Sequence, residues 1–420
     1  YPFPNNHVFF NYFFWLSNHL IDDPLLAARI PSVIFYQVLL LLVFFGVRRY
    51  LKNTEAAFGS ILLCIALFPS GIYGSEGRGY ILFSILLLVS IYALFIAMEN
   101  KHWQKQALSV FVVSSALGAY TIPVFLLPFI SMLLLTGISM LRNPDRLFIK
   151  RLMISVLMVG ATVGFLYLPI FLFSGVEPMV ANKYIQPNTA GNFYSYISPI
   201  ATAEILSYLA AVPSKGWLIW LILGGLGIKV IVKSNDRTRN WLILTALMVL
   251  TIILYGLLMR SFMYERTTTY TVYLLYPAAI LILGYYVNRL AHPVIKRVLY
   301  GVWLCTLPVI GYFQYQHNTY EGSMLPNIHS DMILKYNRIA VDKGWSVYFS
   351  GTSWSLQFIV MSYQYWSEVH EKNTLVVPDY QKADLVVVDT EIFESDTFAR
   401  QQYQQVEETA YGKQAQVDFG

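Results

Sequence analysis

The chain has 420 residues, of which 56% are apolar and only 13% are charged, and its mean hydropathy is +0.51. Soluble domains usually carry roughly 25% charged residues, and disordered chains combine low hydrophobicity with high charge. The composition therefore excludes a soluble cytosolic enzyme and a disordered chain. It predicts an α-helical protein that crosses a membrane many times.

The charge is unevenly distributed along the chain. Residues 318–420 hold 14 acidic and 7 basic residues, a net charge of −7, whereas residues 1–317 hold 10 acidic and 22 basic residues, a net charge of +12. We therefore expect a multi-span membrane domain over 1–317 and a small polar domain over 318–420. The basic residues stand in short loops between apolar stretches, which is not the pattern of a nucleic-acid-binding surface.

The segment from His7 to Leu20 is aromatic and apolar but shorter than the roughly 20 residues that a span requires. We expect a helix lying in the membrane interface, with its aromatic rings at headgroup level. At its start, Asn5, Asn6 and His7 either face a polar site or form a Pro-rich turn in which Asn6 caps the helix.

Ten stretches are apolar enough to be candidate spans. They are Ser32–Gly46, Ala56–Tyr73, Tyr80–Met98, Ala107–Thr121, Pro123–Leu141, Leu152–Phe173, Gly216–Val232, Asn240–Met259, Thr271–Asn288 and Val298–Tyr315. Sixteen of the 22 basic residues in this part fall in alternate loops, which the positive-inside rule assigns to the cytoplasm. The loops on both sides of 107–141 are basic, so this segment is predicted to cross the membrane outward and back.

The same alternation places Tyr1 and the acidic domain outside the cytoplasm. We therefore expect at least one further span upstream of Tyr1. The predicted location is the cell membrane, in a multi-pass topology with an extracytoplasmic C-terminal domain.

The second outward loop, Gly74–Tyr80, holds Arg78 between two glycines, with Glu76 two residues earlier. The planar guanidinium of an arginine suits a phosphate group, and glycine allows the backbone to approach a ligand closely. In one interpretation Arg78 binds a lipid-linked phosphate while Glu76 positions it or contacts a sugar. In the other, an Arg–Glu pair caps a tight helical hairpin.

Two later outward loops carry further polar groups. The loop from Ser174 to Lys215 is rich in aromatic and amide side chains, as sugar sites are, but it also fits an ordinary surface loop; it includes an amphipathic stretch over 201–211. In the loop Arg260–Tyr270, Arg266 is a second phosphate candidate or an interfacial anchor. The sequence contains no nucleophile motif and no metal-spaced histidine pair.

The C-terminal segment has the pattern of a layered α/β unit. Ser330 or Asp331 can cap a helix that runs to about Val341. The other expected elements are strands at Trp345–Ser350, Thr374–Val377 and Ala383–Asp389, and a helix at Ser353–Trp366.

The short motifs resemble those of the GT-C glycosyltransferases. The motifs Asn5-Asn6-His7, Arg29-Ile-Pro-Ser-Val33 and Ser75-Glu-Gly-Arg-Gly-Tyr80 are similar to a pattern in the protein O-mannosyltransferase-like and aminoarabinose-transferase-like membrane enzymes. Arg266, followed by the span from Tyr270 to Pro277, resembles a late position of the same group. The resemblance covers most of residues 1–315.

This resemblance implies an enzyme that moves a sugar from a polyprenyl-phosphate carrier to a lipid, protein or glycan outside the cytoplasmic membrane, typically the bacterial inner membrane. In such enzymes a carboxylate of the first outward loop takes the acceptor's proton, and arginine stabilises the phosphate leaving group. We expect that carboxylate upstream of Tyr1, because Asp22 and Asp23 do not match the motif. The donor-binding residues implied are Asn6, His7, Glu76, Arg78, Tyr80, Arg266 and Tyr270.

No cofactor is indicated, and dependence on a divalent metal stays open. Two other functions remain compatible with the sequence. One is a transporter or flippase of a polyprenyl-linked glycan, and the other is a non-catalytic membrane scaffold. A transferase must release polyprenyl phosphate, whereas a flippase moves the lipid-linked sugar without changing a bond.

Overall fold

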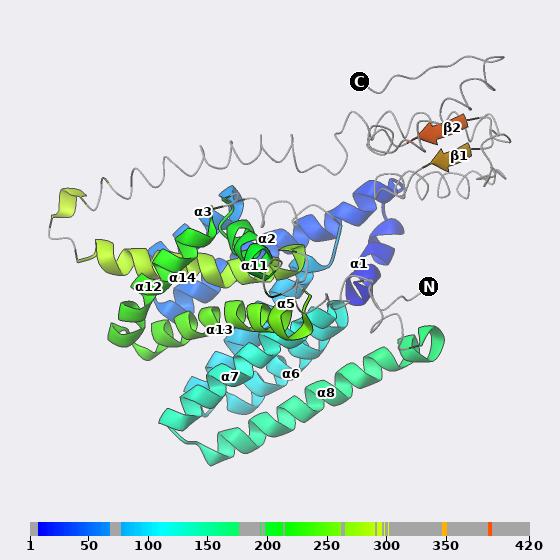
Figure 1. Cartoon of the computed structure of the whole chain (residues 1–420). Coiled ribbons are helices and arrows are strands. Elements are labelled where there is room, and N and C mark those ends of the chain that lie inside the picture. The colour runs from blue at the N-terminus through cyan, green and yellow to red at the C-terminus, as the bar shows by residue number, and fades with distance from the viewer. Residues whose placement is uncertain are drawn as a thin grey trace. The chain divides into compact units, whose positions relative to one another are not determined.

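The structure is a computed structural model. It describes residues 7–67, 77–175, 194, 198–212, 215–261, 265–289, 292–295, 298, 301, 347–350 and 385–388. The chain divides into two compact units, Tyr1–Tyr315 and Gln316–Gly420. The first is helical (Figure 1). Its elements are α1 (Val8–Asn18), α2 (Pro24–Leu51), α3 (Thr54–Ala66), α5 (Tyr80–Glu99), α6 (Gln104–Thr121), the 3-10 helix η1 (Pro123–Phe125), α7 (Leu126–Arg142), α8 (Arg146–Ser174), α11 (Ser198–Leu209), α12 (Trp217–Lys233), α13 (Asp236–Met259), the 3-10 helix η4 (Glu265–Thr271) and α14 (Val272–Val287).

Six helical segments in the described residues are long and apolar enough to cross a membrane. They are Leu26–Leu51, Tyr80–Glu99, Pro123–Arg142, Arg146–Phe173, Asp236–Met259 and Thr267–Val287. A mostly helical, multi-pass protein is therefore confirmed.

The count of ten spans stays a prediction. The predicted spans at 107–121 and 216–232 coincide with α6 and α12, and the first part of the one at 56–73 coincides with α3. The predicted span Val298–Tyr315 lies almost wholly outside the described residues.

The helix α2 begins earlier than predicted. The predicted span begins at Ser32, directly after Pro31, and proline lacks a backbone N–H and usually interrupts a helix. The structure instead accommodates Pro31 inside α2. Asp23 caps this helix, since its Oδ1 accepts the N–H of Leu26 at 3.2 Å and its carbonyl accepts the N–H of Ala27 at 2.9 Å. The helix therefore extends beyond the predicted span at both ends, and a proline at the first helical position, Pro24, suits its start.

The helices α6 and α7 form the predicted hairpin. Phe111 of α6 stacks on Phe129 of α7, with 5.7 Å between the ring centroids. Lys101, before α6, and Asp145, after α7, form an ion pair of 3.7 Å. The chain therefore leaves one end of the bundle along α6 and returns to the same end along α7.

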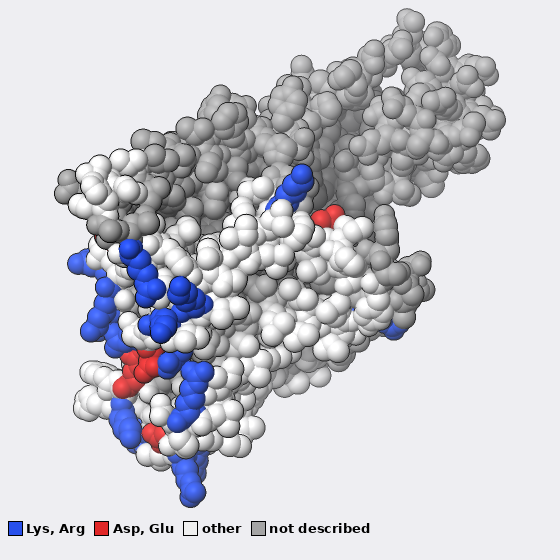
Figure 2. All heavy atoms as spheres, turned by 60° about the vertical axis from the view of Figure 1, so that its left-hand side comes forward, with Lys and Arg blue, Asp and Glu red and all other residues white. Residues whose placement is uncertain are grey.

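That end of the bundle is basic. Arg237 of α13 binds both carboxylate oxygens of Glu99 at the end of α5, at 2.7 and 3.2 Å, and donates to the carbonyl of Tyr50 at the end of α2. Lys and Arg side chains gather at one end of the described surface, with few elsewhere on the visible face (Figure 2). The basic loops near residues 50, 101, 145 and 237 thus meet in space, while their orientation in a membrane stays a prediction.

The interior between the helices is aromatic with isolated hydroxyl pairs. Trp241 of α13 is fully buried, lies beside Tyr92 of α5, and donates its Nε1–H to the carbonyl of Leu274 at 3.3 Å. Ser131 of α7 and Thr251 of α13 pair at 2.9 Å. These bonds satisfy polar groups between helices, where lipid offers no partner.

In the second unit, two parallel strands are described, β1 (Val347–Ser350) and β2 (Leu385–Val388), with Val347 opposite Leu385. Both lie within predicted strands. Parallel neighbours require a crossover connection, which agrees with the expected β-α-β pattern. The other expected elements lie outside the described residues, so the α/β domain over 318–420 stays a prediction.

Candidate functional site at the start of α5

Two of the predicted motifs meet at the start of α5. The Nδ1 atom of His7 accepts a hydrogen bond from the backbone N–H of Gly79 at 3.0 Å, across 72 residues of sequence. The His7 ring also makes an edge contact with the ring of Tyr80, with 4.7 Å between centroids. A ring nitrogen that accepts an N–H carries no proton, so the neutral imidazole holds its proton on Nε2.

His7 reaches this place because α1 packs against the bundle by one face. Phe10 and Ser17, seven residues apart on one face, are buried, while Tyr12 and Trp15 on the opposite face are about 60% exposed. The carbonyl of His7 accepts the N–H of Asn11 at 3.0 Å, which starts the helix. A helix therefore exists here as α1, and His7 at its N-terminal end reaches the loop. Its place in a membrane interface stays a prediction.

The two glycines beside Arg78 allow the loop to pack closely against neighbouring helices. Gly77 has a positive φ of 64°, and a Cβ there would lie 2.8 Å from the carbonyl oxygen of Ala28. A Cβ on Gly79 would lie 2.7 Å from Nδ1 of His7 and 3.0 Å from Cγ2 of Thr121. From the sequence we expected the glycines to let a ligand approach the backbone. In the structure, residues at the start of α1, in α2 and in α6 lie against them instead.

Arg78 is half-buried, and its main chain is fixed between the glycines. Its carbonyl accepts a hydrogen bond from Oγ of Ser32 at 3.4 Å, which ties the loop to α2. In the part of the chain that the structure describes, the Arg78 guanidinium forms no ion pair. Glu76 lies outside the described residues, so the alternative of an Arg–Glu cap stays open.

The late loop lies against the same end of α5. Tyr270 of η4 packs on Phe83, one turn into α5, with 5.2 Å between ring centroids. Thr269 of η4 pairs with Oη of Tyr208 on α11 at 3.0 Å. Tyr270 and Tyr80 are both buried, at 3% and 7% exposure. Both rings are thus packed in the interior near the start of α5.

The remaining predicted site residues are not all described. Asn6 lies outside the described residues, and Arg266 belongs to η4 with its side chain outside them. Among the residues that the structure does describe, no three His, Cys, Asp or Glu side chains are grouped so that they could hold a metal ion.

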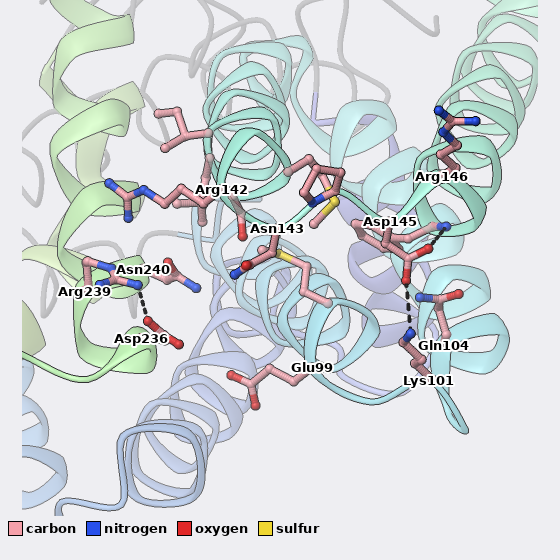
Figure 3. A pocket seen from close by; sticks show the side chains of 17 residues that line it. Glu99, Lys101, Gln104, Arg142, Asn143, Asp145, Arg146, Asp236, Arg239 and Asn240 are labelled. Carbon is pink, nitrogen blue, oxygen red and sulfur yellow. Dashed lines mark hydrogen bonds and ion pairs between the residues drawn. The ribbon is translucent and has the colours of Figure 1, made fainter.

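A second feature, absent from the sequence predictions, lies at the basic end. A hollow of about 700 Å³ opens between the ends of α5 and α7 and the starts of α6, α8 and α13 (Figure 3). Its labelled polar residues are Glu99, Lys101, Gln104, Arg142, Asn143, Asp145, Arg146, Asp236, Arg239 and Asn240. α5 has 20 residues, about 30 Å at 1.5 Å per residue, and this length separates the hollow from His7 and Arg78.

Asp145 organises one side of the hollow. Its Oδ1 accepts the N–H of Phe148 at 3.0 Å and so caps α8. This backbone hydrogen bond, with the ammonium of Lys101, holds the pKa of the Asp145 carboxyl below its usual value. The carboxylate is therefore charged at neutral pH.

Comparisons with known proteins identify the fold. Residues 5–173 match the family model described as Dolichyl-phosphate-mannose-protein mannosyltransferase. The crystal structure of ArnT from Cupriavidus metallidurans in the apo state superposes with a TM-score of 0.53 at 9% identity, covering 81% of this chain and 59% of that one. The chain has the GT-C fold. The resemblance drawn from the short motifs is thereby confirmed.

The GT-C match has clear bounds. The chain spans 59% of the length of the ArnT chain, and the family match covers α1 to α8 without η4 or α14. No match was found among the curated proteins. The matched region contains both His7 and Arg78, so the hydrogen bond from Gly79 to His7 lies within it.

Proposed function

We propose that this GT-C chain is a glycosyltransferase that takes a sugar from a polyprenyl-phosphate carrier and passes it to a lipid, protein or glycan acceptor. The reaction would take place at the extracytoplasmic face of a bacterial inner membrane. The observation that supports this most strongly is the Gly79–His7 hydrogen bond, which joins two family motifs at the end of the bundle opposite the basic one. The family description itself names a sugar carried on a dolichyl phosphate.

In this proposal Arg78 binds the donor phosphate. As the bond between the anomeric carbon and the phosphate oxygen breaks, the phosphate gathers negative charge that a guanidinium stabilises. The acceptor oxygen forms the new bond to that carbon and gives its proton to a carboxylate.

The other residues would position Arg78 and the sugar. His7 holds the loop through the N–H of Gly79, and Ser32 holds it through the carbonyl of Arg78. Tyr80 and Tyr270 would form the wall behind the donor. Asn6, Glu76 and Arg266 are proposed to complete the donor site.

The test is release of polyprenyl phosphate from radiolabelled polyprenyl-phosphate sugars by the full-length protein in membranes. Arg78→Ala should abolish release. Arg78→Lys should recover part of it, because lysine keeps the positive charge but lacks the planar set of N–H donors of arginine. Lys215→Ala is the matched control, since Lys215 is an exposed cation in another predicted outward loop.

Two outcomes would contradict the proposal. One is equal release by the wild type and Arg78→Ala. The other is no release from any donor while the lipid-linked sugar still crosses the bilayer, which would indicate the flippase.

A further inference from the structure

The hollow at the basic end has more positive charge than its own carboxylates neutralise. Three carboxylates border it, and each has a cation of its own. The ion pairs are Glu99–Arg237, Asp145–Lys101 and Asp236–Arg239. These pairs leave Arg142 and Arg146, for which the described residues provide no ion pair.

The two remaining arginines stand on either side of the hollow. Arg142 is the last residue of α7 and Arg146 is the first of α8, and both are exposed. Figure 3 shows their guanidinium groups on opposite sides of the segment that contains Asn143 and Asp145. The hollow thus offers polar space with a surplus of two cations, and it suits an anionic group with a polar extension.

An apolar groove starts at the same arginine. Arg146 also borders a shallower hollow of about 400 Å³ along α8. Its other residues are Ile149, Lys150, Met153, Ile154 and Leu157. Residues four apart lie above one another on a helix, so these side chains form two adjacent rows that run from the cationic end toward the middle of α8.

This side of α8 is uncovered by protein. Met153 and Leu157 are 63% and 72% exposed, and only 17% of the most apolar stretch of α8 is buried. In a multi-pass protein such a face meets lipid chains. The cations Arg146 and Lys150, one turn apart, stand where that apolar face ends.

We propose that an anionic phospholipid binds here. Its phosphate lies at Arg146 and Lys150, its headgroup extends into the hollow toward Arg142, and one acyl chain follows the groove over Met153 and Leu157. A soluble anion would leave the groove unused, and a zwitterionic lipid would leave the surplus charge unneutralised. Basic pockets between helices on the cytoplasmic side are suited to anionic headgroups, and the sequence assigns this end to the cytoplasm.

The test uses the full chain in nanodiscs with phosphatidylglycerol that carries a photoreactive diazirine in one acyl chain. Crosslinks should form on the peptide that contains Met153 and Leu157. The double variant Arg146→Gln/Lys150→Gln should reduce them about tenfold, since each cation near an anionic surface contributes a few-fold in affinity.

The matched control is Lys229→Gln/Lys233→Gln, which removes the same charge from exposed positions of α12 outside both hollows. It should leave crosslinking unchanged. Equal labelling by the phosphatidylcholine analogue, or an equal loss in both double variants, would overturn the proposal. Because this end is far from Arg78, failure here leaves the transferase proposal intact.

Discussion

The substitution Gly79→Ala tests whether the imidazole positions the donor loop. An added Cβ would lie 2.7 Å from Nδ1 of His7, whereas ordinary contacts begin at 3.4 Å. If the ring gives way, it must retreat by the difference, 0.7 Å. The present hydrogen bond of 3.0 Å would then stretch to about 3.7 Å, which is too long for a hydrogen bond.

The expected cost follows from the lost bond. A partly buried N–H left without an acceptor destabilises by about 1–3 kcal/mol, so the melting temperature should fall by a few degrees. Displacement of a group by about 1 Å can lower a rate by roughly 100-fold. We therefore expect the rate of polyprenyl phosphate release to fall by about 10- to 100-fold. The fall should appear in kcat and should exceed the loss of folded protein.

The assay compares Gly79→Ala with Gly137→Ala in the same membranes. Gly137 is inside α7, and a Cβ there meets no described atom within 4 Å, so this control should keep wild-type activity. His7→Gln, which keeps an acceptor, should recover part of the rate that His7→Ala loses. Wild-type kcat in a well-folded Gly79→Ala protein would refute the positioning role of His7.

Two further predictions concern stability. Ser131→Ala and Thr251→Val should show a coupling free energy of about 0.6 kcal/mol in a double-mutant cycle of unfolding, because their hydroxyls pair between α7 and α13; strictly additive effects would argue against this bond. Asp145→Ala should lower the melting temperature at pH 7, since the fold depresses the pKa of this carboxyl and so gains stability from its charged form. That gain should be lost as the pH falls below about 4, and a constant difference between wild type and variant from pH 7 to 3 would contradict the assignment.

Much of the helical architecture could be predicted because apolar length and loop charge are local signals. The basic loops identified α6 and α7 as a hairpin, although only Ile122 separates the two predicted spans. The start of α2 could not be predicted in this way, because Pro31 is a break signal that the packed bundle overrides. The end of α5, by contrast, was predicted closely: the predicted span ends at Met98 and the helix ends at Glu99.

The residues of the candidate site could be predicted from the sequence, but their arrangement in space could not. The sequence singled out His7 and Arg78, but nothing local indicates that Nδ1 of His7 accepts the N–H of Gly79. The role of the glycines also depends on tertiary neighbours, because Ala28 and Thr121 occupy the space beside them.

The hollow at the basic end was missed because its charges come from separate loops. In sequence, Arg142 and Arg146 read as ordinary positive-inside residues. Only the fold shows that the nearby carboxylates are already paired. A surplus of charge at one place is a property of the folded chain, not of any one loop.

The central claim is that a lipid-linked phosphate binds beside Arg78. The most direct measurement is photocrosslinking of the full-length protein in membranes with a polyprenyl phosphate that carries a photoreactive group near its phosphate. The account predicts labelling of the peptide that contains Gly77 to Tyr80, competed by unlabelled polyprenyl phosphate and lost in Arg78→Ala but not in Lys215→Ala. Labelling confined to other segments, or undiminished labelling in Arg78→Ala, would contradict it.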